Sequence, residues 1–268
     1  MSEWIVPVIC EVVQERKAIA GLLRETRERM KGRHIAITGM PGAGKTVLLE
    51  HLSGSAYVAG YKPPGASGSV ERAKISGKSR IIASTIPGQD TYIRLGAIDR
   101  LLKSRRAVDG VIHVVNYGYS VLRETSAADI LIQSHGISTI DMMRQYFMAE
   151  ELKDLKATLD VLRSTIHKKK KPQWLIVAAT KADLFADQLT DAAKYYSIES
   201  GNSEFVDCLR KFQGQIGSDN IIIETRPVAA SLENLVWNGE TVKSQLLPNA
   251  RDNFILNLSK AVEDKCGV

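Results

Sequence analysis

Residues 39–46 form a glycine-rich segment that strongly constrains how this chain can fold. They read Gly-Met-Pro-Gly-Ala-Gly-Lys-Thr, which is the complete pattern G-x-x-x-x-G-K-[ST]. Glycines allow the backbone to curl so that several N–H groups face one cluster of oxyanions. The apolar run 34–38 suits a buried strand, and residues 46–52 suit a helix. The segment therefore predicts a strand, a phosphate-binding loop and a helix whose positive end faces the phosphates.

Two side chains of this loop are candidate ligands. We expect Lys45 to bridge the β- and γ-phosphates of a nucleoside triphosphate, and the Thr46 hydroxyl to bind Mg²⁺. The loop alone does not distinguish ATP from GTP. The candidate nucleotide-binding residues here are Gly39, Pro41, Gly42, Ala43, Gly44, Lys45, Thr46 and Val47.

A second motif indicates which base is bound. The apolar run 174–179 is typical of a buried strand, and Thr180-Lys181-Ala182-Asp183 follows it. A carboxylate in the plane of guanine can accept from two N–H donors that adenine does not offer together. With these motifs in this order, the chain resembles the Ras-like and Arf-like small GTPases, whose guanine-reading motif is [NT]-K-x-D.

The resemblance covers about 34–262 and implies further site residues. Thr85-Ile86-Pro87-Gly88-Gln89 stands where the family has D-x-x-G-Q. There the Gly88 N–H would meet the γ-phosphate, and Gln89 would orient the attacking water. Ala230 matches the family's last guanine loop, so its N–H would meet guanine O6. In the guanine motif, Thr180, Lys181 and Asp183 would hold the base, with the Lys181 ammonium reaching back to the phosphate loop.

The departures from the family pattern concern the metal. Thr85 replaces the Asp that usually holds Mg²⁺ through water, and a hydroxyl is a weaker acceptor than a carboxylate. No Thr lies between Thr46 and Thr85, although the family's first switch uses one. Ser67 and Ser69 are the available substitutes, and we favour Ser67 as a metal ligand. The alternative is a Gly/Pro/Ser loop with no role at the metal.

Composition places the chain among ordinary globular proteins. It has 268 residues, 44% of them hydrophobic, and three widely spaced cysteines, which argues against a disulfide framework. No apolar run is long enough to span a bilayer, and the first residues lack a basic leader. We therefore expect a cytoplasmic location. The net charge is +6, but no aromatic residues interleave with the basic runs, so membrane or nucleic-acid contact is not favoured.

The remaining pattern divides the chain. Residues 1–32 predict an apolar lead and an amphipathic helix, which either packs on the following domain or docks on a membrane or protein. Residues 33–268 predict the nucleotide domain, with an elaboration at 117–172 and an Asn-Gly hairpin near 235–243. Within the elaboration we expect a loop over 117–137. A long helix over 140–166 follows, whose apolar stripe serves the core or a coiled-coil seam.

Together these features predict a single α/β domain with a three-layer P-loop NTPase (Ras-like) fold. Its sheet is mostly parallel with one antiparallel edge strand, and an extra N-terminal helix is added. The expected function is a switch that binds GTP and GDP with Mg²⁺ and hydrolyses GTP slowly. Gln89 and Lys45 are the candidate catalytic residues, and a protein effector or activating partner is expected. The alternative is a non-hydrolysing GTP/GDP-binding module that serves as an adaptor or scaffold subunit.

Overall fold

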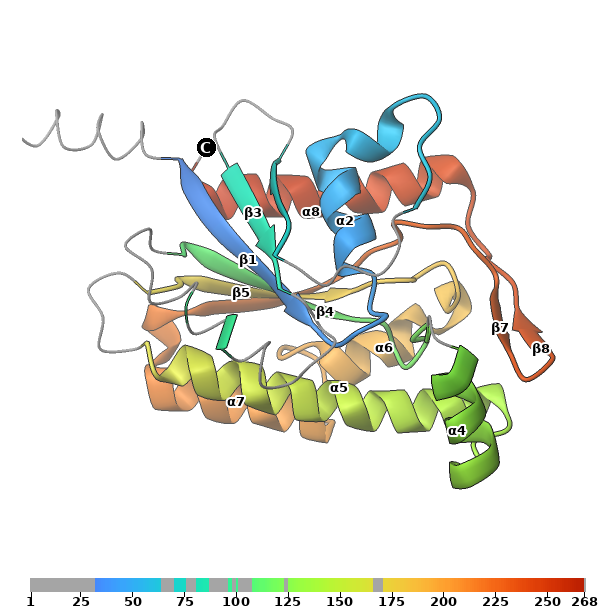
Figure 1. The fold of residues 1–268 in the computed structure, drawn as a ribbon. Coiled ribbons are helices and arrows are strands. Elements are labelled where there is room, and N and C mark those ends of the chain that lie inside the picture. The colour runs from blue at the N-terminus through green and yellow to red at the C-terminus, as the bar shows by residue number, and fades with distance from the viewer. Residues whose placement is uncertain are drawn as a thin grey trace, which may run out of the picture. The chain divides into compact units, whose positions relative to one another are not determined.

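A six-stranded sheet with the order β2-β3-β1-β4-β5-β6 organises the fold (Figure 1). The computed structural model describes residues 32–63, 70–75, 81–86, 96–97, 100, 108–122, 125–165 and 171–267. The sheet strands are β1 (Arg33–Gly39), β2 (Arg72–Lys74), β3 (Ile81–Thr85), β4 (Gly110–Val115), β5 (Trp174–Ala179) and β6 (Ile222–Pro227). The α-helices are α2 (Lys45–Ser53), α4 (Thr125–His135), α5 (Ile140–Arg163), α6 (Leu189–Tyr196), α7 (Glu204–Ile216) and α8 (Pro248–Cys266). Short 3₁₀ turns are η1 (Ser55–Tyr57), η2 (Ala186–Gln188) and η3 (Ser218–Asn220).

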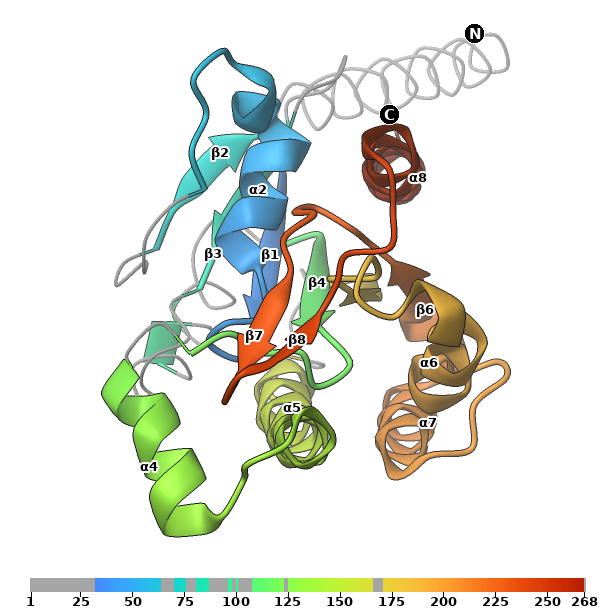
Figure 2. The same cartoon turned by 90° about the vertical axis from the view of Figure 1, so that its right-hand side faces the viewer.

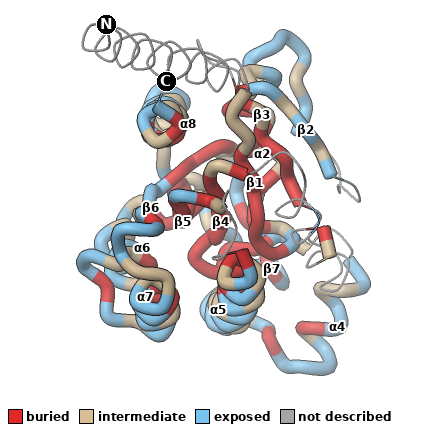
Figure 3. The backbone as a smooth tube through the Cα atoms, turned by 90° about the vertical axis from the view of Figure 1, so that its left-hand side faces the viewer, coloured by how far each residue is buried: buried red, intermediate tan, exposed pale blue. Residues whose placement is uncertain are grey.

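The pairing of the strands confirms the predicted sheet. β1 pairs with β4, β4 with β5 and β5 with β6, all in parallel. At the edge, β2 runs antiparallel to β3. β4 and β5 are buried along their whole length, as expected for strands whose two faces are both covered by helices (Figure 3).

Helices cover both faces of the sheet, which confirms the three-layer architecture. α2 and α8 lie together on one face, and α5 and α7 lie together on the other, with α6 beside α7 (Figures 1 and 2). One face of α5 and α7 is buried against the sheet. The other is exposed, so each helix is amphipathic and not the seam of a coiled coil.

The strand register brings four loops to one edge of the sheet. Gly39 pairs with Val114, Val115 with Ala179, and Ala179 with Pro227. The carboxyl ends of β1, β4, β5 and β6 are therefore level. In open parallel sheets ligands bind beside this edge, and the segments that follow these strands form the candidate site.

The region between β4 and β5 corrects one expectation. The segment 117–137 is not a loop throughout, because α4 occupies Thr125–His135. Leu131 is buried, and Ala128 and Ile132 pack partly against the core, so these residues share one helical face. The expectation of a long helix is confirmed by α5, which begins after the Thr139 N-cap, whose side chain accepts from Met142 N.

A short hairpin follows β6. β7 (Leu235–Trp237) and β8 (Glu240–Val242) pair antiparallel across the turn Asn238-Gly239. The Trp237 indole N–H donates to Ile137 O at 2.9 Å, and Glu240 accepts from Ile140 N at 2.9 Å. These two hydrogen bonds join the hairpin to the segment between α4 and α5 and to the first residue of α5.

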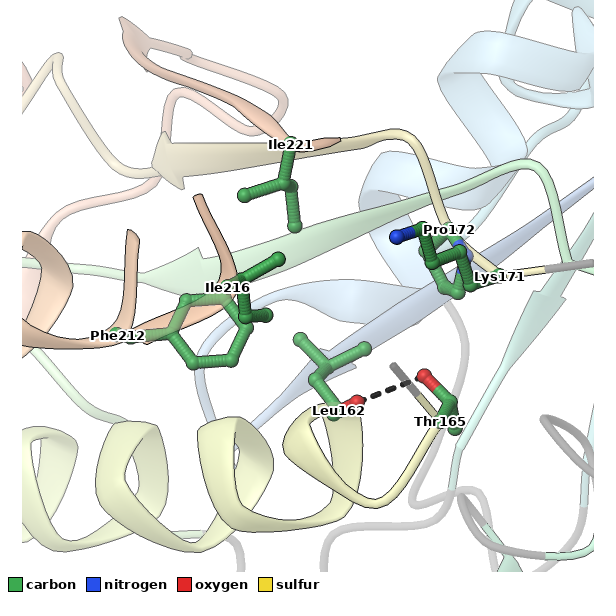
Figure 4. Close-up of a pocket in the computed structure, with 7 residues that line it drawn as sticks. All are labelled: Leu162, Thr165, Lys171, Pro172, Phe212, Ile216 and Ile221. Atoms are coloured by element: carbon green, nitrogen blue, oxygen red, sulfur yellow. Dashed lines mark hydrogen bonds between the residues drawn. The ribbon is translucent and has the colours of Figure 1, made fainter. Parts of the chain in front are cut away.

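The opposite end of the sheet carries a small apolar pocket (Figure 4). Its lining residues precede β5 and β6, belong to α5 and α7, or directly follow α5. They are Leu162, Thr165, Lys171, Pro172, Phe212, Ile216 and Ile221. Because it lies at the amino ends of these strands, it is separate from the candidate site.

The chain divides into two compact units, Met1–Arg33 and His34–Val268. The N-terminal helix expected within 1–32 lies outside the described residues. Among the helices that are described, none is long and apolar enough to cross a membrane.

Candidate functional site

The segment after β1 forms a glycine cradle at the carboxyl edge of the sheet. Gly39, Gly42 and Gly44 all adopt positive φ, at 134°, 75° and 90°. A Cβ at Gly42 would lie 2.4 Å from Val121 O, so only glycine fits this position. Gly44 is the N-cap of α2 and has no side chain that could cap the first helical N–H groups. These groups and the positive helix end are suited to an anion.

Lys45 and Thr46 stand at the start of α2. The Lys45 ammonium donates to Gly39 O and Met40 O, both at 2.8 Å, and its side chain is buried. The ammonium therefore lies within the curl of the loop, where phosphate oxygens would bind. Thr46 is half-buried beside it.

The segment after β5 places a buried carboxylate at the same edge. Asp183 is 1% exposed, and neither of its carboxylate oxygens has a hydrogen-bond partner among the described residues. Burial raises the pKa of the Asp183 carboxyl above its usual range. A buried acceptor without a donor costs free energy, so this position fits a ligand that brings N–H donors.

Thr180 and Lys181 link this segment to its neighbours. The Thr180 hydroxyl donates to Ala43 O of the phosphate loop at 2.6 Å. Lys181, which adopts a positive φ of 58°, donates from its ammonium to Tyr119 O in the segment after β4. Thr180 thus contacts the phosphate loop directly, and Lys181 contacts the turn after β4.

Ala230 lies in the segment after β6, close to the guanine motif. Val228 N donates to Ala179 O at 2.8 Å, and Ala182 N donates to Val228 O at 3.0 Å. Ala230 itself is 6% exposed. The structure therefore brings this segment to the same edge as Asp183.

Thr85, one of the residues predicted to contact the metal, is the last residue of β3. It is buried, and its hydroxyl has no hydrogen-bond partner within the described part of the chain. An unpaired buried hydroxyl fits a contact to a metal-bound water. The other candidates on this side, Ser67, Gly88 and Gln89, lie outside the described residues.

Sequence reasoning missed a buried carboxylate on α5. Glu151 is 1% exposed and accepts from Asn116 N at 2.7 Å, in the turn after β4. A signal was present, because positions 147, 151, 154 and 158 continue the helical spacing of the buried stripe and two of them carry carboxylates. A charged residue on a core-facing stripe indicates a specific polar partner.

This carboxylate has a testable pH dependence. Burial raises the pKa of Glu151 to about 7, although hydrogen bonds from the Tyr196 hydroxyl and from backbone N–H groups favour its charged form. The folded state therefore binds this proton more tightly than the unfolded state, whose pKa is near 4.5. The contribution of Glu151 to stability is fully present below pH 4.5 and is lost as the pH rises to about 7.

We expect the free energy of unfolding of the wild type to fall by about 3 kcal/mol relative to Glu151→Gln across that interval. Urea unfolding of both proteins at a series of pH values measures this difference. If the free energies of unfolding of the two proteins change with pH in parallel, Glu151 in the folded state does not titrate in that interval.

Comparison with known proteins gives the family. The sequence profile described as 50S ribosome-binding GTPase matches residues 34–180, more than half of the chain. The fold and this match define the protein as a P-loop GTPase of the Ras-like class. The chain belongs to the 50S ribosome-binding GTPase family, and it is a guanine-nucleotide-binding switch protein. No curated protein sequence matches the chain.

Several solved structures resemble it at low identity. Toc33 from Arabidopsis thaliana in complex with GDP and Mg²⁺ is 17% identical, with 94% of this chain and 91% of that chain covered and a TM-score of 0.47. The SRb-GTP/SRX complex of the signal recognition particle receptor from Chaetomium thermophilum is 15% identical, with 85% and 97% covered and a TM-score of 0.47. Bacterial EF-Sec, a selenocysteine-specific elongation factor, is 16% identical with a TM-score of 0.46. The match covers 88% of this chain but 29% of the factor.

Proposed function

We propose that this GTPase binds GTP and GDP with Mg²⁺ at the carboxyl edge of the sheet and hydrolyses GTP slowly. The observation that carries the proposal is the convergence of the glycine cradle and the unpaired carboxylate of Asp183 on one edge. The segments near 60–72 and 86–96 would be the switches. A protein effector or activating partner would respond to them, and residues 1–32 would form a separate N-terminal element.

In this proposal the base is held by the segments after β5 and β6. Asp183 would accept from the two N–H donors of guanine, which would satisfy its buried oxygens. The Lys181 stem would lie along the base, and the Ala230 N–H would meet the carbonyl oxygen. The Thr180 hydroxyl fixes the distance between this part and the phosphate loop through Ala43 O.

The phosphates would lie in the glycine cradle. The backbone of Gly39, Pro41, Gly42, Ala43 and Gly44 and the first residues of α2, Lys45 to Val47, would surround them. Lys45 would exchange its two loop carbonyls for phosphate oxygens. Mg²⁺ would be bound, directly or through water, by the hydroxyls of Thr46, Thr85 and Ser67. The metal would neutralise phosphate charge.

Hydrolysis would depend on the segment after β3. Gly88 would donate its N–H to the terminal phosphate, and Gln89 would orient the attacking water. Thr85 supplies a neutral hydroxyl where an ionised acceptor would hold the metal shell more firmly. We therefore expect intrinsic turnover far below the roughly 1–100 s⁻¹ of fully equipped phosphoryl-transfer enzymes.

Two substitutions test this assignment. Thr85→Asp is expected to lower the Mg²⁺ concentration needed for half-maximal turnover, because a carboxylate adds a charged acceptor. Gln89→Leu is expected to remove hydrolysis while GTP affinity stays unchanged, because the side chain acts on water. Single-turnover hydrolysis with metal titration, paired with direct GTP titration, measures both effects.

The outcomes separate the two candidate functions. Rapid hydrolysis by the isolated wild type would contradict a weakened metal site. Turnover that survives Gln89→Leu would assign the water to another residue. No turnover in the wild type, with GTP retained on the purified protein, would favour the non-hydrolysing adaptor or scaffold module, which the neutral Thr85 side chain also supports.

A further inference from the structure

The turn that follows β4 has an unusual backbone. Tyr119 N donates to Asn116 O at 3.0 Å, and the two central residues, Tyr117 and Gly118, have positive φ values of 55° and 79°. This is the arrangement of a type I′ turn, in which a bulky residue such as tyrosine is disfavoured at φ above zero. A Cβ at Gly118 would lie 2.4 Å from Arg144 O of α5, so the turn packs directly on that helix.

Two buried side chains hold this turn by its backbone. Glu151 Oε1 accepts from Asn116 N at 2.7 Å and from Gly118 N at 3.4 Å. The Tyr196 hydroxyl accepts from Tyr117 N at 3.1 Å and donates to Glu151 Oε2. Three consecutive N–H groups are thus bound by one carboxylate and one hydroxyl from two different helices, α5 and α6.

Arg144 of α5 also contacts this turn. Its guanidinium lies 4.7 Å from the ring centroids of both Tyr117 and Tyr119. Cation–π contacts of this kind stabilise the aromatic side chains against α5. Contacts from α5 and α6 therefore hold the turn in this conformation.

The 116–119 turn contacts both parts of the nucleotide site, the phosphate loop and the guanine motif. Asn116 Nδ2 donates to Gly42 O at 3.4 Å, and the carbonyl oxygen of Val121, just after the turn, lies 2.4 Å from the position that a Cβ at Gly42 would take. Tyr119 O accepts from the Lys181 ammonium. One short segment, residues 116–121, therefore contacts the phosphate loop and the guanine motif.

We propose that Glu151 and Tyr196 are positioning residues for the nucleotide site. They fix the 116–119 turn, and the turn fixes the phosphate loop at Gly42 and the guanine motif at Lys181. This inference rests on the nucleotide site proposed above. It also explains why a carboxylate is buried under the sheet, where a well-packed apolar side chain would be less costly.

The test compares Tyr196→Phe, Glu151→Ala and Glu151→Gln with the wild type. The readouts are the dissociation rate of fluorescently labelled GDP, displaced by excess GDP, and the thermal unfolding midpoint without nucleotide. Thr158→Val is the matched control, because it removes another buried polar group from the same face of α5, two turns further on.

We expect Tyr196→Phe and Glu151→Ala to speed GDP dissociation about tenfold or more, since each leaves backbone donors of the turn unpaired. Glu151→Gln keeps an acceptor oxygen for Asn116 N and should recover most of the slow dissociation lost in Glu151→Ala. Thr158→Val should dissociate at the wild-type rate.

Three results would overturn the inference. In the first, Tyr196→Phe lowers the unfolding midpoint but leaves the dissociation rate unchanged, which assigns the pair to stability alone. In the second, Glu151→Gln is as impaired as Glu151→Ala. If Glu151→Ala does not fold, Tyr196→Phe decides the question. In the third, wild-type protein does not bind GDP, and the proposed function fails together with this inference.

Discussion

Replacing Asp183 with Asn is expected to weaken GTP binding by about 2–3 kcal/mol, or about 30- to 160-fold. The carboxylate is buried and unpaired among the described residues, so guanine donors would be its main partners. An amide keeps one acceptor but turns a donor toward the base, and xanthine presents an oxygen where guanine has an amine. Asp183→Asn should therefore prefer xanthosine nucleotides. Direct titration with GTP, xanthosine triphosphate and ATP measures the change.

Asp183→Asn weakens nucleotide binding but should stabilise the protein without nucleotide against unfolding. Burial disfavours the charged form of Asp183, so removing the charge is expected to raise the unfolding midpoint. Asp187→Asn, an exposed carboxylate four residues further on, serves as the control and should change neither quantity. If the wild type binds ATP as tightly as GTP, the assignment of the base to Asp183 is wrong.

Replacing Lys45 with Ala is expected to reduce nucleotide affinity by about 3 kcal/mol or more, which is over 100-fold. The ammonium is buried inside the glycine cradle and would make charge-assisted hydrogen bonds to phosphate oxygens. Calorimetric titration with GDP and with GTP gives the loss for each nucleotide.

The effect of Lys45→Ala on the protein without nucleotide should be smaller. Lys45 donates to Gly39 O and Met40 O, and the lost bonds would lower the free energy of unfolding by about 1–3 kcal/mol. The control is Lys153→Ala, which removes an exposed lysine paired with Glu150 on α5 and should leave affinity unchanged. Wild-type affinity in Lys45→Ala would show that the cradle does not bind phosphates.

Much of the site was predictable because its motifs are local. The curl of residues 39–46 depends on glycines at fixed spacing, and the structure has positive φ at Gly39, Gly42 and Gly44. Thr180 to Asp183 directly follow a continuous apolar run that can only be a buried strand or helix segment. Once both strands run parallel in one sheet, here with β4 between them, the loops that follow them lie at the same edge.

The parts that sequence reasoning missed depend on contacts between distant residues. Glu151 and Tyr196 are 45 positions apart, and neither motif nor spacing relates them to Asn116. Likewise, the sequence predicts a loop where α4 lies, because the apolar face of this helix is short, with Leu131 as its buried residue. A short helix gains its stability from packing, which local propensity does not report.

The sequence by itself determined the fold class, the order of the motifs and the chemistry each one offers, because these follow from backbone preferences and side-chain types over a few residues. Only the tertiary structure decided that the Thr180 hydroxyl contacts the phosphate loop at Ala43 O and that the Lys181 ammonium donates to Tyr119 O. It also decided that a carboxylate from α5 holds the turn after β4. These choices arise when strands and helices pack, since burial then requires each polar group to find whichever partner the fold brings within reach.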